Sequence, residues 1–78
     1  MQKGFKFING NIEYTVLDYA VTKHGDIALL KRDTYCPFVV ARVLQPQPDG
    51  RFIWAWGNYF TERCNAEEYF RTRTAELQ

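Results

Sequence analysis

A strand that is apolar on both of its faces is the feature that most constrains this chain. The segment RFIWAWGNYF holds five aromatic rings in ten positions. Side chains alternate between the two faces of a strand, so Phe52, Trp54 and Trp56 are expected to share one face, with Ile53 on the other. A domain of this size buries only about 60% of its unfolded surface and can rarely cover both faces of such a strand. The second face must be covered by the protein's own core, by a second copy or by a partner.

Short turn signals divide the chain into five extended segments. The Asn-Gly pair at 9–10 favours the tight primed turn of a hairpin. Further turns are indicated by KHGD at 23–26 and by PQPDG at 46–50, where glycine tolerates a left-handed backbone. Pro37 interrupts the chain just before the β-branched run FVVARVLQ. Five strands joined in order by short connections predict an antiparallel meander over about residues 4–60.

The second of these segments changes the phase of its alternation. Apolar residues alternate from Ile12 to Val16, and a new alternation then starts at Leu17 and continues to Val21. A bulge or sharp bend near residues 16–18 accounts for the change. A bend of this kind could also curl the sheet into a small five-stranded β-barrel with the tryptophans inside, which is the alternative to an open sheet.

The end of the chain has a different pattern. NAEEYFRTRTAEL predicts a helix over about residues 65–76, with Asn65 and Glu68 spaced as in a capping box. An apolar stripe that includes Tyr69 and Phe70 recurs at helical spacing and must pack on the sheet. The sequence therefore predicts a single α+β domain over residues 1–78, an antiparallel sheet of about five strands with one C-terminal helix packed on it.

The helix is expected to pack on the side of the sheet that has the smaller side chains. That side presents Val39, Ala41, Ile53 and Ala55. A helix that carries large rings needs a sheet surface of small side chains to approach within about 10 Å. This placement would leave the tryptophan side of the last strand turned away from the helix.

Charge and hydropathy limit the classes of function. Ten Lys and Arg residues face nine Asp and Glu residues, and no basic block interrupts the mixture. Nucleic-acid binders usually show a clustered basic surface, so this class is disfavoured. The start of the chain lacks the apolar run of a signal peptide, and no segment reaches the ~20 apolar residues of a membrane span. We therefore expect a cytoplasmic protein that does not cross a membrane.

The chain offers no set of residues that is typical of an active site or a metal site. His24 lies beside Asp26 in a turn, where both are expected to be solvated surface residues. Cys36 and Cys64 are expected to be reduced, and together with one histidine they do not provide the four closely spaced ligands of a structural zinc site. We expect no enzymatic activity, no metal and no cofactor.

The candidate binding residues are rings and cations of the last two strands: Phe52, Trp54, Trp56, Tyr59 and Arg42. Protein-binding hot spots favour Trp, Tyr and Arg, and a large exposed apolar patch on a small domain usually marks an interaction site. We expect a protein partner, with self-association as a further possibility. The alternative is a single-stranded nucleic-acid-binding module, because such modules also stack bases on aromatic side chains beside positive charge.

The order of several short segments resembles a group of known proteins. INGNIEYTVLDYA, GDIALLKR, FVVARVL, WAWGNYF and AEEYF, over about residues 5–70, resemble small, mostly uncharacterised accessory proteins of phages and conjugative elements of gut bacteria. The resemblance implies a non-enzymatic binder that inhibits a host defence system such as CRISPR. No functional residues carry over from it. The longer TERCN segment departs from the pattern and leaves the start of the helix open.

Overall fold

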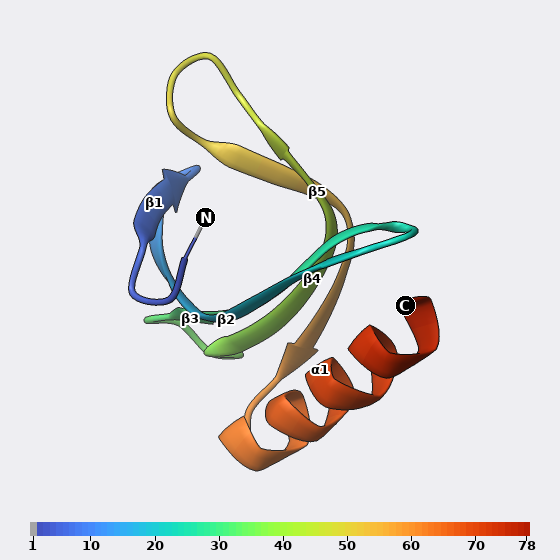
Figure 1. Ribbon diagram of the computed structural model, residues 1–78. Coiled ribbons are helices and arrows are strands. Elements are labelled where there is room, and N and C mark those ends of the chain that lie inside the picture. Colours follow the sequence, from blue (N-terminus) through green and yellow to red (C-terminus); the bar gives the residue numbers. More distant parts are fainter. Residues whose placement is uncertain (1) are drawn as a thin grey trace.

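The computed structural model describes residues 2–78 and confirms the α+β meander. The elements are β1 (Lys6–Asn9), β2 (Ile12–Thr22), β3 (Gly25–Arg32), β4 (Phe38–Pro46), β5 (Phe52–Phe60) and α1 (Arg63–Leu77). The strands pair antiparallel in chain order, and α1 lies across the outer side of the curled sheet (Figure 1). In the described chain β1 and β5 do not pair with each other, so the sheet is a half-barrel, between the open sheet and the closed barrel.

A bulge in β2 starts the curl of the sheet. Val16 pairs with Leu30 and Asp18 pairs with Leu29, which leaves Leu17 without a partner in the ladder. The bulge predicted near residues 16–18 is therefore confirmed. The extra residue reverses the alternation, so that Val16 and Tyr19 both pack on the concave side while Leu17 and Ala20 pack on the helix side.

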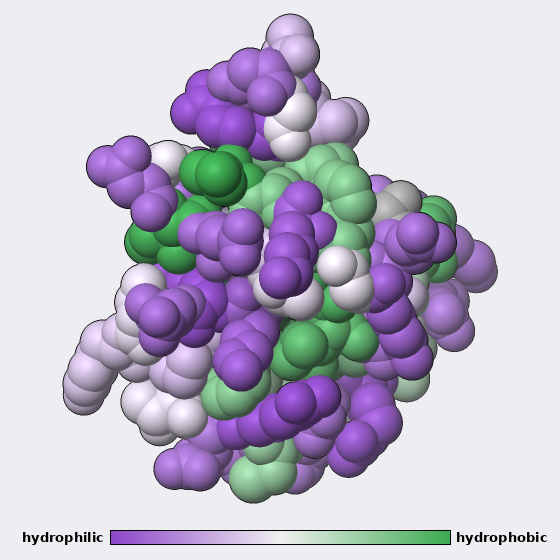
Figure 2. All heavy atoms as spheres, turned by 90° about the vertical axis from the view of Figure 1, so that its left-hand side faces the viewer, coloured by the Kyte–Doolittle hydropathy of each residue, from purple (hydrophilic) through white to green (hydrophobic). Residues whose placement is uncertain are grey.

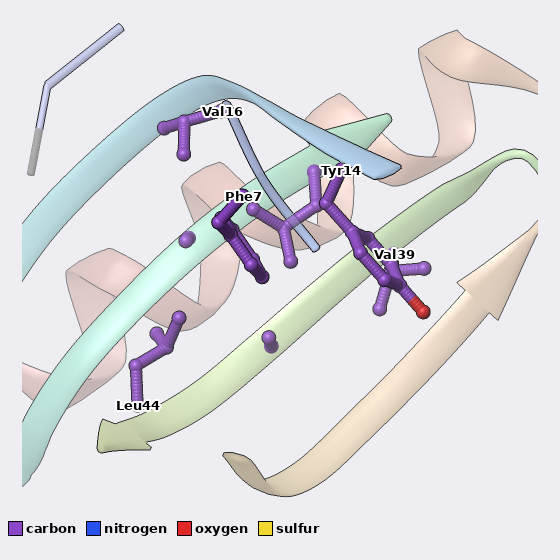
Figure 3. Close-up of a cluster of buried hydrophobic side chains, with 8 residues drawn as sticks. Phe7, Tyr14, Val16, Val39 and Leu44 are labelled. Carbon is purple, nitrogen blue, oxygen red and sulfur yellow. The ribbon is translucent and has the colours of Figure 1, made fainter. Parts of the chain in front are cut away.

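The concave side of the sheet holds one of two hydrophobic cores. Its buried residues are Phe7, Tyr14, Val16, Ala28, Leu30, Val39, Ala41 and Leu44. Figure 3 shows Phe7 and Tyr14 side by side within this cluster, and their rings stack with centroids 5.4 Å apart. Each ring removes roughly 150–250 Å² from water, which is how a small domain fills a curved sheet.

The convex side of the sheet is covered by α1. Its buried residues are Ile27, Leu29, Val40, Ala66 and Phe70. The prediction that the helix packs on the side of Val39 and Ala41 was wrong, because these residues face the concave core and are 0% exposed. Those small side chains make room for the rings of the chain's own strands inside the curl.

The helix also begins earlier than the sequence predicts. It starts at Arg63, after Glu62, and its first turn has no side-chain cap hydrogen bond. Asn65 and Glu68 lie inside the helix, so the capping box prediction was wrong. An ion pair between Arg63 and Glu67, 3.2 Å and four residues apart, stabilises this earlier start.

A hydrogen bond joins the two strands of the β2–β3 hairpin. The Tyr19 hydroxyl donates to Oδ2 of Asp26 over 2.6 Å. Burial, followed by this hydrogen bond and by the negative charge of Asp26, raises the pKa of Tyr19 from 10.0 to about 12. All three causes disfavour the tyrosinate, so the neutral side chain is the form that fits the folded protein.

This raised pKa predicts a pH dependence of stability. Between pH 10 and about 12 the unfolded chain loses the Tyr19 proton while the folded chain keeps it, so the free energy of unfolding falls as the pH rises. The stabilisation is fully present below pH 10. We expect Tyr19→Phe to show a shallower fall than the wild type in urea unfolding at pH values on both sides of 10. Parallel curves for the two proteins would contradict the assignment.

Candidate functional site

Strand β5 is an edge strand without the usual protection of an edge. Among residues 2–78 it pairs only with β4, and no charged residue or proline lies between Phe52 and Phe60. The other edge strand, β1, has four residues and includes Lys6, and the surface on its side is largely hydrophilic around a smaller apolar group (Figure 2). Short length and lysine are common ways to protect an edge. The longer, uncharged edge of β5 therefore stands out as a place where another chain can bind.

The two tryptophans of β5 do not share a face, so the predicted single aromatic face was wrong. The reason is Val43 in β4, which has a φ of 59°, a left-handed conformation that is rare for a β-branched residue. Around it, Arg42 pairs with Trp56 and Leu44 pairs with Trp54. Leu44 and Trp54 belong to the concave cluster, whereas Arg42 lies in the row of Ile27, which packs under the helix.

Phe52 and Trp54 belong to the concave core. The Phe7 ring lies 5.2 Å from the Phe52 ring and 6.4 Å from the Trp54 ring, measured between centroids. The indole of Trp54 passes over Gly57, where an added Cβ would lie 2.8 Å from the indole nitrogen. Glycine therefore allows this close contact. These two members of the candidate set are mainly structural.

Trp56 is the exposed ring on the helix side of the sheet. It is 58% exposed, and the guanidinium carbon of Arg42 lies 5.5 Å from its ring centroid. This is a cation–π distance. Nε of Arg42 is buried and has no hydrogen-bond partner within residues 2–78. Arg42 and Trp56 therefore form a cationic and aromatic surface, and the Nε–H group of Arg42 donates no hydrogen bond within residues 2–78.

Tyr59 is the exposed ring on the concave side of β5. It is 49% exposed, and the guanidinium carbon of Arg32 lies 4.8 Å from its ring centroid. Nε of Arg32 donates to the Cys36 carbonyl over 2.9 Å, and Nη1 donates to the Tyr14 hydroxyl over 3.2 Å. Arg32 was not among the sequence candidates, because it belongs to β3 and reaches β5 only through the curl of the sheet.

Arg32 and Arg42 are two of the cations that have no carboxylate partner in the described chain. Four cations make ion pairs: Lys3 with Asp18, Arg51 with Asp49, Arg63 with Glu67, and Arg73 with Glu76. Neither Arg32 nor Arg42 has a carboxylate within 4.0 Å in the part of the chain that the structure describes. The rings of β5 are thus flanked by two positive charges that the protein itself does not neutralise.

The other sequence candidates form no constellation. His24 is exposed, and Asp26 accepts the hydrogen bond of Tyr19. Cys36 and Cys64 are free thiols. Among residues 2–78 no three His, Cys, Asp or Glu side chains are arranged to hold a metal ion.

A hollow with mostly polar residues in its walls lies beside Arg32. It has a volume of about 450 Å³ and is lined by the β1–β2 turn, the start of β2 and the end of β3. Glu13, Lys31 and Asp33 are among its walls. Thr15, Thr34 and Arg32 also line it, and we assign it no chemistry.

Comparisons with known proteins identify no relative. No protein-family model matches the chain, and neither a curated protein nor a solved structure matches it. The resemblance to accessory proteins of mobile elements remains a sequence-based prediction. Within residues 2–78, no helix combines the length and the apolar character needed to cross a bilayer.

Proposed function

We propose that this protein is a non-enzymatic protein-binding module whose contact surface is the outer part of β5. The observation that carries the proposal is the pairing of exposed rings with unneutralised arginines, Trp56 with Arg42 and Tyr59 with Arg32. Tryptophan, tyrosine and arginine dominate protein hot spots because they bring large, rigid contact areas with hydrogen-bonding capacity. Both rings are about half exposed, so a partner can still cover them.

The charge distribution favours a protein over a nucleic acid as the partner. A protein that neutralises several phosphates needs a cluster of free lysines and arginines. Here the net charge is +1, and four of the cations are already paired with carboxylates. Arg32 of β3 and Arg42 of β4 flank rings on opposite faces of the sheet, which suits a few directed contacts better than a continuous phosphate backbone.

We further propose a biological setting for this binder. The resemblance of its segment order to phage and conjugative-element proteins supports an accessory role on a mobile element, inside the cytoplasm of the host cell. In that setting the partner would be a component of a host defence system such as CRISPR. The resemblance supports only this part of the proposal, and the binding surface is argued independently of it.

A photo-cross-linker tests the proposed surface directly. With benzoylphenylalanine in place of Trp56, we expect irradiation in extracts of the cells that naturally contain the protein to give one discrete protein adduct. The adduct is expected to survive nuclease treatment and to form in high salt, because the contact does not depend on counterion release.

The matched control places the same cross-linker at Ile8. That side chain is 53% exposed, close to the 58% of Trp56, and it lies in β1, at the opposite edge of the strand order. Equal adducts at positions 8 and 56 would indicate nonspecific contact and contradict the proposal. An adduct removed by nuclease would support the nucleic-acid alternative, and an adduct of twice the chain's mass would assign the surface to self-association.

A further inference from the structure

We propose that β5 binds an extended segment of its partner as an additional strand, and that this segment carries acidic side chains on both of its faces. The inference rests on the proposed protein-binding function and names the class of partner. It combines two independent observations. One is the free backbone edge of β5, and the other is the pair of arginines that lack carboxylates.

The backbone of β5 uses its hydrogen-bonding groups on one side only, and those on the other side are free within the described residues. From Pro46↔Phe52 to Phe38↔Phe60 its partner is β4, and the described residues contain no ladder on its other side. A strand in this state is a ready template for strand addition, in which main-chain hydrogen bonds give affinity and alternate side chains give specificity.

The chain's own β1 covers only the beginning of this edge. Near Phe52, the rings of Phe5 and Phe7 approach with centroid distances of 6.0 and 5.2 Å. Toward the other end, Trp56 and Tyr59 keep about half of their surface exposed. The added strand is therefore expected along the second half of β5.

The arginines decide between a second copy and another protein. If β5 of a second copy paired with this edge, it would bring no acidic side chain, because no Asp or Glu lies between Phe52 and Phe60. Arg42, with its unpaired buried Nε, and Arg32 would then be covered without a counter-charge, which is costly. A partner strand with carboxylates instead supplies charge-assisted hydrogen bonds.

The positions of the arginines also set the spacing of the acids. Trp56 pairs with Arg42 on the helix side of the sheet, whereas Tyr59 pairs with Val39 of the concave core. Side chains of an added strand alternate between the same two faces. Its two acidic residues must therefore be an odd number of positions apart, and three apart if they lie opposite Trp56 and Tyr59.

A display selection with random peptides as long as the nine-residue β5 tests this inference. We expect the purified protein to enrich peptides with β-forming residues and two acids at odd spacing. A synthetic enriched peptide is expected to bind about tenfold more weakly to Arg42→Gln and to Arg32→Gln, while Arg71→Gln on the exposed face of α1 leaves binding unchanged. Thermal unfolding of each variant shows whether it is folded.

The peptide backbone provides a test that needs no protein variant. Methylation of alternate amide nitrogens should abolish binding for one set of positions and spare the other, because only one edge of the added strand faces β5. Equal binding of both methylated peptides would overturn the inference. So would enriched peptides that carry no acidic residues, or a selection that gives no enrichment over the Arg32→Gln, Arg42→Gln double variant. If the cross-linker at position 56 still forms a protein adduct in those cases, the proposed binding function is supported and only the strand-addition inference is wrong.

Discussion

Replacing Phe70 by alanine is expected to lower the free energy of unfolding by about 3–5 kcal/mol. Phe70 is 6% exposed and lies in the core between α1 and the convex side of the sheet, together with Leu29 and Val40. Removing the ring leaves a cavity beneath the only helix in residues 2–78. Small domains have about 5–15 kcal/mol in total, so the variant is expected to lose a large part of its stability.

Urea unfolding followed by circular dichroism measures this loss. Thr72→Ala is the matched control, because Thr72 is an exposed residue of the same helix, and its replacement is expected to change stability by no more than about 0.5 kcal/mol. If Phe70→Ala unfolded at the same urea concentration as the control, α1 would not be anchored by this ring.

The parts of the fold that local chemistry determines could be predicted from the sequence. The hairpin turn, the bulge at Leu17 and the C-terminal helix each follow from a few neighbouring residues, although the turn residues are Gly10 and Asn11 and not the predicted Asn9 and Gly10. Their short connections then leave a meander as the natural topology. The order and pairing of all five strands could therefore be derived before any coordinates.

The assignment of faces could not be predicted, because it depends on a backbone conformation that the sequence does not signal. Val43 adopts a left-handed φ, although β-branched residues normally avoid it. The alternation breaks at this residue, so that Leu44 and its partner Trp54 lie on the concave side while Arg42 and its partner Trp56 stay on the helix side. An alternation rule applied to the letters alone puts both tryptophans on one face.

The candidate site was predicted in part for the same reason. The rings of Trp56 and Tyr59 could be identified from composition, since they belong to the uncharged strand itself. Arg32 could not, because it lies 27 positions before Tyr59 in the chain and meets its ring only when the sheet curls. Long-range contacts across a curved sheet depend on the curvature, and no local pattern encodes it.

Replacing Phe7 by alanine is expected to cost about 3–5 kcal/mol, a loss as large as that of Phe70→Ala. Phe7 is 5% exposed, and its ring contacts Tyr14, Phe52 and Trp54, so it joins the first and last strands across the opening of the half-barrel. The neighbouring Phe5 is 39% exposed, and its replacement is expected to cost much less.

Fluorescence shows whether the loss comes from the opening of the concave core. In a Trp56→Phe background, Trp54 is the only indole, and we expect its emission to shift to the red in Phe7→Ala and to stay unchanged in Phe5→Ala. A red shift with an unchanged circular dichroism spectrum would mean that Phe7 closes the core over Trp54. Binding would then be restricted to the outer part of β5. Equal, small effects of both replacements would instead mean that β1 does not close the core, and that Trp54 belongs to the accessible surface with Trp56.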